Sequence, residues 1–271
     1  MKYDKTVLYR EMESFYLTTT EDEGDDLRTV RSIMGGLVRK ARKAIPAEDN
    51  VKEKIHKLLQ LMYGDWGFYC DRETYFRAEN LYLSYVLRTK QGMPVSLGCI
   101  LLYLAEKLDL PIYPVLFPTQ LILRADVEGE TAFIDPWNGN YVSRDDLQKL
   151  YQGAFGFGAT LTAEDLAIAD PKELTERFAQ LAKSTLIREE LNSAALKYIE
   201  SRLRWKKIVN KSEDPYERRD RGLVLAQMGA YHAAVEDLQF FVEHCPDDPT
   251  AYMLMAQLPE MKKEISGELL N

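Results

Sequence analysis

Gln91-Gly92-Met93-Pro94-Val95-Ser96-Leu97-Gly98-Cys99 opens the stretch of sequence that decides the fold, and Ile134-Asp135-Pro136-Trp137-Asn138-Gly139 closes it. Residues 100–108 between them are apolar on nearly every side, which predicts a buried helix. Two extended segments follow, with prolines confined to the ends and edge of the first. A hairpin turn at residues 127–130 joins the second strand to its return strand. This order predicts a helix whose N-terminus faces a small antiparallel sheet.

The composition describes a globular chain without obvious targeting segments. The 271 residues are 46% hydrophobic and carry a net charge of −8, which argues against a dedicated nucleic-acid binder. The N-terminus mixes charges and lacks the apolar run of a secretory signal, and no segment has the apolar length that a membrane span needs. We therefore expect a cytoplasmic protein that does not enter a membrane.

Cysteine and histidine are scarce and widely spaced. The cysteines are Cys70, Cys99 and Cys245, and the histidines are His56, His232 and His244. The sparse, odd cysteine count without CxxC spacing argues against a disulfide framework or structural zinc. Hence neither a metal nor a cofactor is expected.

Helices are predicted on both sides of the central stretch. Apolar residues at helical spacing predict helices over residues 27–41, 51–62 and 75–87. From Lys172 onward the chain reads as helical to its end, with apolar residues recurring along it.

The glycines at 153, 156 and 158 predict a loop between two domains, with a loop that lines a site as the alternative. We expect a helix-rich α+β domain at residues 1–160 and an all-α domain at residues 161–271.

Small residues and a terminal proline recur at fixed spacing in the last third of the chain. The repeat signature is Gly222, Gly229, Tyr231, Ala234 and Pro246, with Leu225 and Leu238 between them. Small residues let two helices cross closely, and the proline ends the second helix. Asp214-Pro215 begins this unit, and Asp248-Pro249 begins the next one 34 residues later. This spacing matches the tetratricopeptide repeat, so we expect the region to bind a protein or peptide partner.

The central stretch has the frame of a thiol site, which needs three groups. They are a cysteine at the helix start, a histidine base on the facing strand and a carboxylate that orients the histidine. Asp135 stands at the carboxylate position, although an Asp-Pro turn explains it as well. Gln120 stands at the base position, and an amide cannot take up the proton. Because no histidine lies between residues 57 and 231, general-base catalysis by this pair is not expected.

Two residues compete for the position of the nucleophile. Ser96 lies at the expected start of the helix, where a serine is most often an N-cap. Cys99 lies about one turn further on among apolar residues, where a free cysteine is usually inert packing. Its proximity to a helix N-terminus nevertheless makes it the alternative nucleophile. We therefore predict no catalytic residue and interpret Ser96, Gln120 and Asp135 as a vestigial triad.

A ligand groove is predicted at the same place. Its expected lining is Ser96, Gln120, Arg124, Asp135, Trp137 and Asn138. Arg124 shares a strand face with Gln120, and it is expected to pair with an acid or to hold an anionic ligand. The basic runs at residues 39–43 and 202–211 are interpreted as solvated helix faces, with a nucleic-acid patch as the alternative for the second.

Several blocks of the sequence together resemble one bacterial family. Gly92–Gly98, Phe117–Arg124 and Ile134–Gly139 are similar to signature blocks of the invasion-regulator (Sir) family, as are Leu61–Phe68 and Asp214–Gly222. The resemblance implies a transglutaminase-like, papain-like core joined to a tetratricopeptide tail, with no assigned biochemical activity. Broader relatives carry Gly-His where Thr119-Gln120 stands here. The resemblance therefore maps the catalytic histidine to Gln120, the carboxylate to Asp135 and the family's serine to Ser96.

These observations favour a non-catalytic interaction or regulatory protein on a transglutaminase-like core. The resemblance adds an effect on virulence or invasion-gene expression. The alternative is a thiol amidohydrolase or acyltransferase that uses Cys99 with an unconventional base.

Overall fold

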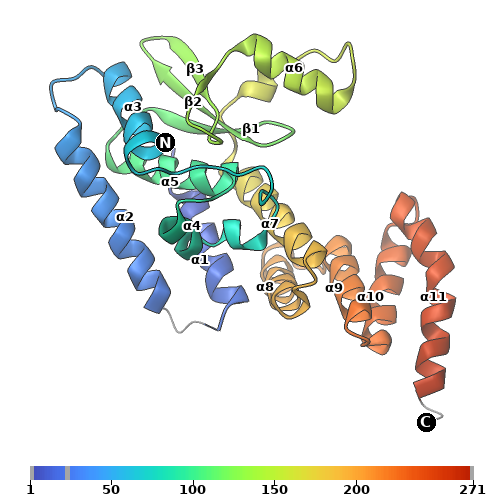
Figure 1. The fold of residues 1–271 in the computed structure, drawn as a ribbon. Coiled ribbons are helices and arrows are strands. Elements are labelled where there is room, and N and C mark those ends of the chain that lie inside the picture. The colour runs from blue at the N-terminus through green and yellow to red at the C-terminus, as the bar shows by residue number, and fades with distance from the viewer. Residues whose placement is uncertain (1–2, 22–24, 269–271) are drawn as a thin grey trace. The chain divides into compact units, whose positions relative to one another are not determined.

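The computed structural model describes residues 3–21 and 25–268, which form two compact units (Figure 1). Of these residues, 3–17 and 25–182 form the first unit, and 18–21 and 183–268 form the second. The first unit therefore extends past residue 160, where the sequence analysis placed the start of the second domain.

The first unit combines helices with one small sheet, as the sequence predicts. Its helices are most of α1 (Val7–Thr19), α2 (Asp25–Ala44), α3 (Val51–Leu59), η1 (Gln60–Asp65), η2 (Ala78–Leu81), α4 (Leu83–Thr89), α5 (Pro94–Lys107), α6 (Arg144–Phe155), η3 (Glu164–Leu166) and the first part of α7 (Pro171–Arg188). Its strands are β1 (Ile112–Leu116), β2 (Leu121–Val127), β3 (Glu130–Ile134) and β4 (Tyr141–Val142). The strands are antiparallel in the order β1-β2-β3-β4.

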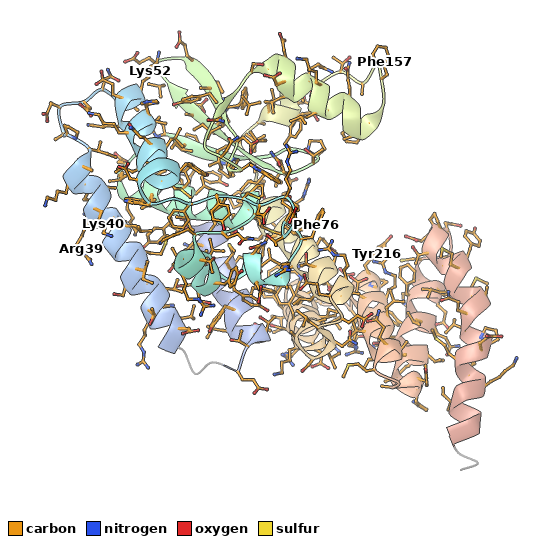
Figure 2. All side chains as sticks on the ribbon, viewed as in Figure 1. Arg39, Lys40, Lys52, Phe76, Phe157 and Tyr216 are labelled. Carbon is orange, nitrogen blue, oxygen red and sulfur yellow. The ribbon has the colours of Figure 1, made fainter. Side chains whose placement is uncertain are left out.

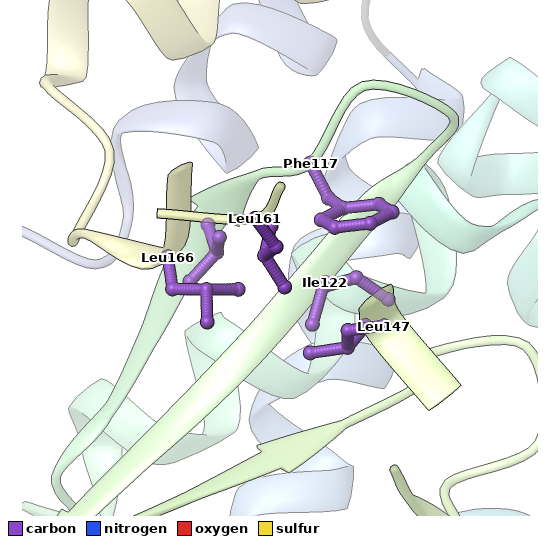
Figure 3. Close-up of a cluster of buried hydrophobic side chains, with 6 residues drawn as sticks. Phe117, Ile122, Leu147, Leu161 and Leu166 are labelled. Carbon is purple, nitrogen blue, oxygen red and sulfur yellow. The ribbon is translucent and has the colours of Figure 1, made fainter. Parts of the chain in front are cut away.

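Alternation along β2 places the sheet between two helical layers. Leu121 faces α5, where a Cβ added to Gly98 would lie only 2.6 Å from its Cδ2 atom. Ile122 points to the opposite face, because successive strand residues alternate. There it joins a buried cluster made of Val115, Phe117, Ile122, Leu147, Leu161 and Leu166 (Figure 3). The missing side chain of Gly98 thus lets α5 lie directly against β2.

The cluster shows that the segment after β4 belongs to the core. Residues 144–155 form α6, a helix that the sequence analysis did not predict, and Leu147 anchors it on the sheet. Gly153 lies inside that helix, whereas Gly156 and Gly158 have positive φ angles in the loop that follows. Between these two glycines the side chain of Phe157 is fully exposed (Figure 2). The chain then returns to the sheet, and the Ala169 amide donates to the Pro114 carbonyl at 2.8 Å.

The helix predicted over residues 75–87 is wrong in its first half. The segment before η2 is irregular, and α4 begins only at Leu83. Asn80 explains the difference, because its buried amide donates to the carbonyls of Thr74 at 2.7 Å and Tyr75 at 3.3 Å. These bonds hold the chain in a turn that helical spacing of apolar residues does not reveal.

The second unit is all-α, as predicted. It contains the end of α7 together with α8 (Asn192–Asn210), α9 (Pro215–Gln227), α10 (Tyr231–His244) and α11 (Pro249–Glu268). Gly222 of α9 lies against α10, since a Cβ there would be 2.8 Å from Leu238 Cγ. Gly229 has a φ angle of +78° in the turn, Tyr231 begins α10, and the buried Ala234 faces inward. Pro246 follows the end of α10, so every signature residue stands at a tetratricopeptide position.

A buried ionic network joins α7, α8 and α9 within the second unit. Glu217 is fully buried and contacts Lys183 at 2.8 Å, Arg202 at 3.2 Å and Lys206 at 3.1 Å. Lys183 also contacts Asp220 at 2.6 Å. The interpretation of residues 202–211 as one solvated face is therefore wrong for Arg202 and Lys206. The same burial removes them from a nucleic-acid patch.

Candidate functional site

The N-terminus of α5 is closed by the hydroxyl group of Ser96. Pro94 is the first helical residue, and Met93 rather than Ser96 is the N-cap. Ser96 Oγ accepts a hydrogen bond from the Met93 amide at 3.0 Å and donates one to the Met93 carbonyl at 3.1 Å. The side chain is fully buried. Its hydroxyl is thus held by the backbone that precedes the helix.

The turn at Asp135 is held by hydrogen bonds within the turn itself and by one from Tyr63. The Gly139 amide donates to the Asp135 carbonyl at 2.8 Å, and the Trp137 amide donates to Asp135 Oδ1 at 2.8 Å. Tyr63 donates from its hydroxyl to the Pro136 carbonyl at 2.8 Å. Gly139 has a φ angle of +73°, and a Cβ there would overlap the Tyr63 ring. Glycine is therefore required at this position, and the carboxylate is held in place.

Gln120 completes the pair expected from the sequence. Its Nε2 atom donates a hydrogen bond of 3.0 Å to Asp135 Oδ1. Burial raises the pKa of Asp135, while the bonds from the Trp137 amide and the Gln120 side chain oppose that rise. The carboxylate thus binds two N–H donors, neither of which titrates near neutral pH.

A cavity of about 90 Å³ opens between the start of α5, the end of β1 and α7. Its walls are mostly apolar: Met93, Pro94, Val95, Leu116, Phe117, Leu121, Leu174, Phe178 and Leu181. Tyr75, Thr119, Gln120 and Arg177 supply its polar groups. Val95, and not Ser96, is the residue of the first helical turn that lines it beside Pro94. The start of α5 therefore presents hydrocarbon side chains to the cavity, and neither Ser96 nor Cys99 lines it.

Comparison with known proteins identifies the families to which the two parts of the chain are similar. Residues 28–180 match the transglutaminase-like superfamily, and residues 182–259 match the tetratricopeptide repeat. A UPF0162 protein of Haemophilus influenzae is 58% identical over 268 residues, which cover 99% of this chain and 98% of that protein. The chain belongs to the UPF0162 family.

Other members of the UPF0162 family carry names that confirm the resemblance drawn from the sequence. The SirB1 protein of Salmonella typhimurium is 43% identical over 223 residues, which cover 82% of this chain and 81% of that protein. The UPF0162 protein YchA of Escherichia coli is 42% identical over the same length. No solved structure matches the chain.

Three of the six residues predicted for the groove lie together in this UPF0162 protein, but Gln120 is the one of the six that lines the cavity. Gln120 and Asp135 are bonded, and Trp137 follows in the same turn, stacked on Tyr75 with ring centroids 5.3 Å apart. Ser96 is turned inward, and Asn138 is exposed, with its Oδ1 accepting from the Asn140 amide at 3.0 Å.

Arg124 belongs to a different surface. It contacts Asp126 at 2.8 Å and donates to Thr131 Oγ1 at 3.0 Å and to the Leu166 carbonyl at 2.8 Å. With Phe133 and Tyr141 it lines an open hollow beside β3 and β4. The groove as a ligand site stays a prediction, with Arg124 outside the cavity at α5.

The thiol groups of Cys99 and Cys70 do not have the lowered pKa that a nucleophile requires. Cys99 is fully buried, and that burial, together with the charge of Glu13, raises its pKa. Cys70 is half-buried, and burial followed by the charges of Asp135 and Asp71 raises its pKa to about 12. A reactive thiolate needs the opposite shift. The influence of Asp135 on Cys70 has no local sequence signal, because 65 residues separate the two.

His56, His232 and His244 are all exposed, and none lines the cavity. Within residues 3–21 and 25–268, no group of three His, Cys, Asp or Glu side chains could hold a metal ion. Among the helices of the described residues, none has both the length and the apolar character that crossing a bilayer needs.

Arg177 and Tyr75 are the site residues that sequence reasoning missed. Arg177 lies on α7, 42 residues after Asp135, and it reaches the loop before β2 with hydrogen bonds to the Phe117 and Pro118 carbonyls. Tyr75 lies in the segment that was predicted as helix. Neither has a local sequence signal, since both reach the site through the packing of distant segments.

Proposed function

We propose that the first unit is a non-catalytic binding domain on a transglutaminase-like frame, and that the repeat unit binds a protein or peptide partner. The hydrogen bond from Gln120 to Asp135 carries the proposal. It puts a neutral amide in the base position and occupies the carboxylate oxygen that would orient an imidazole. A site without a base cannot activate a hydroxyl or an ordinary thiol.

The first turn of α5 supports the same conclusion. Val95 lines the cavity, Ser96 bonds to the preceding backbone, and Cys99 is buried with a raised pKa. What remains is an apolar cavity with a few polar groups at its rim, which is the usual form of a binding site.

The repeat unit supports a role in recognition. Tetratricopeptide arrays generally present helical surfaces to protein partners. Tyr252 and Met255 leave more than half of their side chains exposed, one turn apart on α11. We place the protein in the cytoplasm, in keeping with its three free cysteines. The regulatory role implied by the resemblance to the Sir family belongs to the same proposal.

Turnover measurements test the absence of catalysis. The full chain is incubated with a glutamine-containing peptide, with and without a labelled amine, and products are followed by mass spectrometry. We expect no hydrolysis, deamidation or amine incorporation by the wild type, Gln120→His, Asp135→Ala or Cys99→Ser. Product formation by the wild type that Asp135→Ala or Cys99→Ser abolishes would overturn the proposal and support a thiol enzyme.

A further inference from the structure

The cavity at the start of α5 carries a positive charge that the proposed binding function does not explain. Arg177 stands at its rim with an exposed side chain. Its Nη2 atom donates to the Phe117 carbonyl at 3.0 Å and to the Pro118 carbonyl at 2.5 Å. Carbonyl groups accept these bonds without neutralising the cation. Among the described residues, no carboxylate forms an ion pair with Arg177.

The remaining donors of Arg177 are free to bind a ligand. A guanidinium group has five N–H donors, and the two carbonyl contacts use only those of Nη2. Arg177 and Tyr75 both line the cavity. The positive charge of Arg177 also opposes the rise in the pKa of Tyr75 that burial, Cys70 and Asp135 cause.

The nearby acid does not compensate this charge. Asp135 Oδ1 accepts hydrogen bonds from Gln120 and from the Trp137 amide. Gln120 lines the cavity, whereas Asp135 does not. The cavity wall thus contains the neutral amide of Gln120 and the cation of Arg177, without the carboxylate itself.

The size and lining of the cavity define the rest of the ligand. Nine of its 13 lining residues are apolar, which favours a hydrocarbon side chain. Its volume of about 90 Å³ is smaller than the roughly 150 Å³ of a cavity known to bind benzene. A branched aliphatic group fits this space better than an aromatic ring.

We propose that the cavity binds the C-terminal residue of a partner peptide that ends in a branched aliphatic side chain, with Arg177 binding the terminal carboxylate. This inference rests on the proposed non-catalytic function of the same site. Only the last residue of a peptide has a free backbone carboxylate next to its side chain. Arginine matches that group because its planar fork can donate two parallel hydrogen bonds. Capture of a terminal carboxylate is a known mode of peptide recognition.

Fluorescence anisotropy with the full chain tests the inference. The probes are fluorescein-labelled pentapeptides that end in leucine, as the free acid and as the C-terminal amide, and matched peptides that end in alanine or tryptophan. We expect the leucine acid to bind at least about tenfold more tightly than the amide, since a hydrogen bond to a charged group contributes that much. Weaker binding of the alanine and tryptophan peptides is also expected.

Variants assign the effect to the residues of the cavity. Arg177→Gln should bind the leucine acid and the leucine amide with equal affinity. Arg177→Lys should keep only part of the wild type's preference for the acid. Val95→Phe should weaken the binding of both leucine peptides, because the larger side chain fills the cavity. Arg144→Gln, which changes an exposed arginine outside the cavity, should bind like the wild type. Circular dichroism checks that each variant is folded.

The outcomes separate this inference from the proposed function. Equal binding of acid and amide, or no binding of any peptide at millimolar concentration, would overturn the inference alone. Equal affinity for N-acetyl-leucine and the leucine peptide would assign the cavity to a small acid and overturn the peptide assignment. Mass spectrometry of the recovered peptides addresses the proposed function, which a cleaved or modified peptide would overturn.

Discussion

Gln120 donates a hydrogen bond of 3.0 Å from its side-chain amide to Asp135 Oδ1, the same oxygen that accepts from the Trp137 amide. Both donors are neutral N–H groups. The bond from Gln120 joins the loop before β2 to the turn after β3. In the sequence this pair reads as a damaged catalytic site, whereas in the structure it is a stabilising contact.

Asp135→Ala should destabilise the protein more than Asp135→Asn. Alanine leaves the Trp137 amide without its acceptor, and an unsatisfied buried donor costs about 1–3 kcal/mol. Asparagine keeps an oxygen at the position of Oδ1 and should cost less. Urea unfolding measures the free energy of unfolding of both variants. Asp145→Ala, on the exposed surface of α6, is the control and should have nearly the stability of the wild type. Equal losses for the two Asp135 variants would contradict this role of Oδ1.

The stabilising effect of Asp135 should also depend on pH. Burial raises its pKa in the folded state above the ordinary value of about 3.9. The folded protein then binds this proton more tightly than the unfolded chain, so stability from this group falls as pH rises through the folded pKa. The difference in unfolding free energy between wild type and Asp135→Asn should be larger at pH 4 than at pH 7. A difference that grows with pH would mean that the pKa is lowered instead.

Cys99 should react slowly in the native protein. Burial raises its pKa, so the thiolate population at neutral pH is small, and no solvent reaches the sulfur. Iodoacetamide labelling of Cys70→Ser/Cys245→Ser, followed by mass spectrometry, should show slow modification at pH 7 and rapid modification in urea. Rapid labelling well below pH 8 without denaturant would support the alternative of a thiol enzyme.

The frame of the site could be predicted because its signals are local. Asp135-Pro136 and the glycine at 139 specify a turn, and the apolar run after Cys99 specifies a buried helix. The repeat could be predicted from the sequence in the same way, since Gly222 and Ala234 stand at fixed spacing. Each of these signals lies within one helix, one turn or one pair of consecutive helices, and it depends on the size or backbone preference of the residue itself.

The lining of the cavity could not be predicted for the opposite reason. Ser96 and Val95 are adjacent, and which of them faces the cavity depends on a helix start that the sequence places only to within a few residues. Arg124 shares a strand with residues near the site, but its bonds to Asp126 and Leu166 hold it on another surface. Arg202 and Lys206 looked like solvated charges because their partner Glu217 lies on the next helix.

Glu217→Ala should strongly destabilise the repeat unit. Lys183, Arg202 and Lys206 surround this carboxylate, and their charges outweigh burial and hold the pKa of Glu217 below its ordinary value. Removing one member of a buried ion pair leaves uncompensated charge and costs about 3–5 kcal/mol. Urea unfolding measures the loss, and Glu236→Ala, at an exposed carboxylate on α10, should have little effect. Similar stability of the two variants would show that water already solvates the cations.

Gly222→Ala should destabilise the crossing of α9 and α10, although alanine is the better helix former. An added Cβ would lie 2.8 Å from Leu238 Cγ and 3.1 Å from Asp237 Cβ, both of which are buried. Forcing extra volume into a packed contact costs about 1–3 kcal/mol, which exceeds the gain of about 1 kcal/mol in helix propensity. Gly153→Ala in α6 is the matched control, because a Cβ there meets nothing within 4 Å. Thermal unfolding should show a lower Tm for Gly222→Ala and an unchanged or higher Tm for Gly153→Ala. A rise in Tm for both would mean that α9 and α10 can move apart without loss.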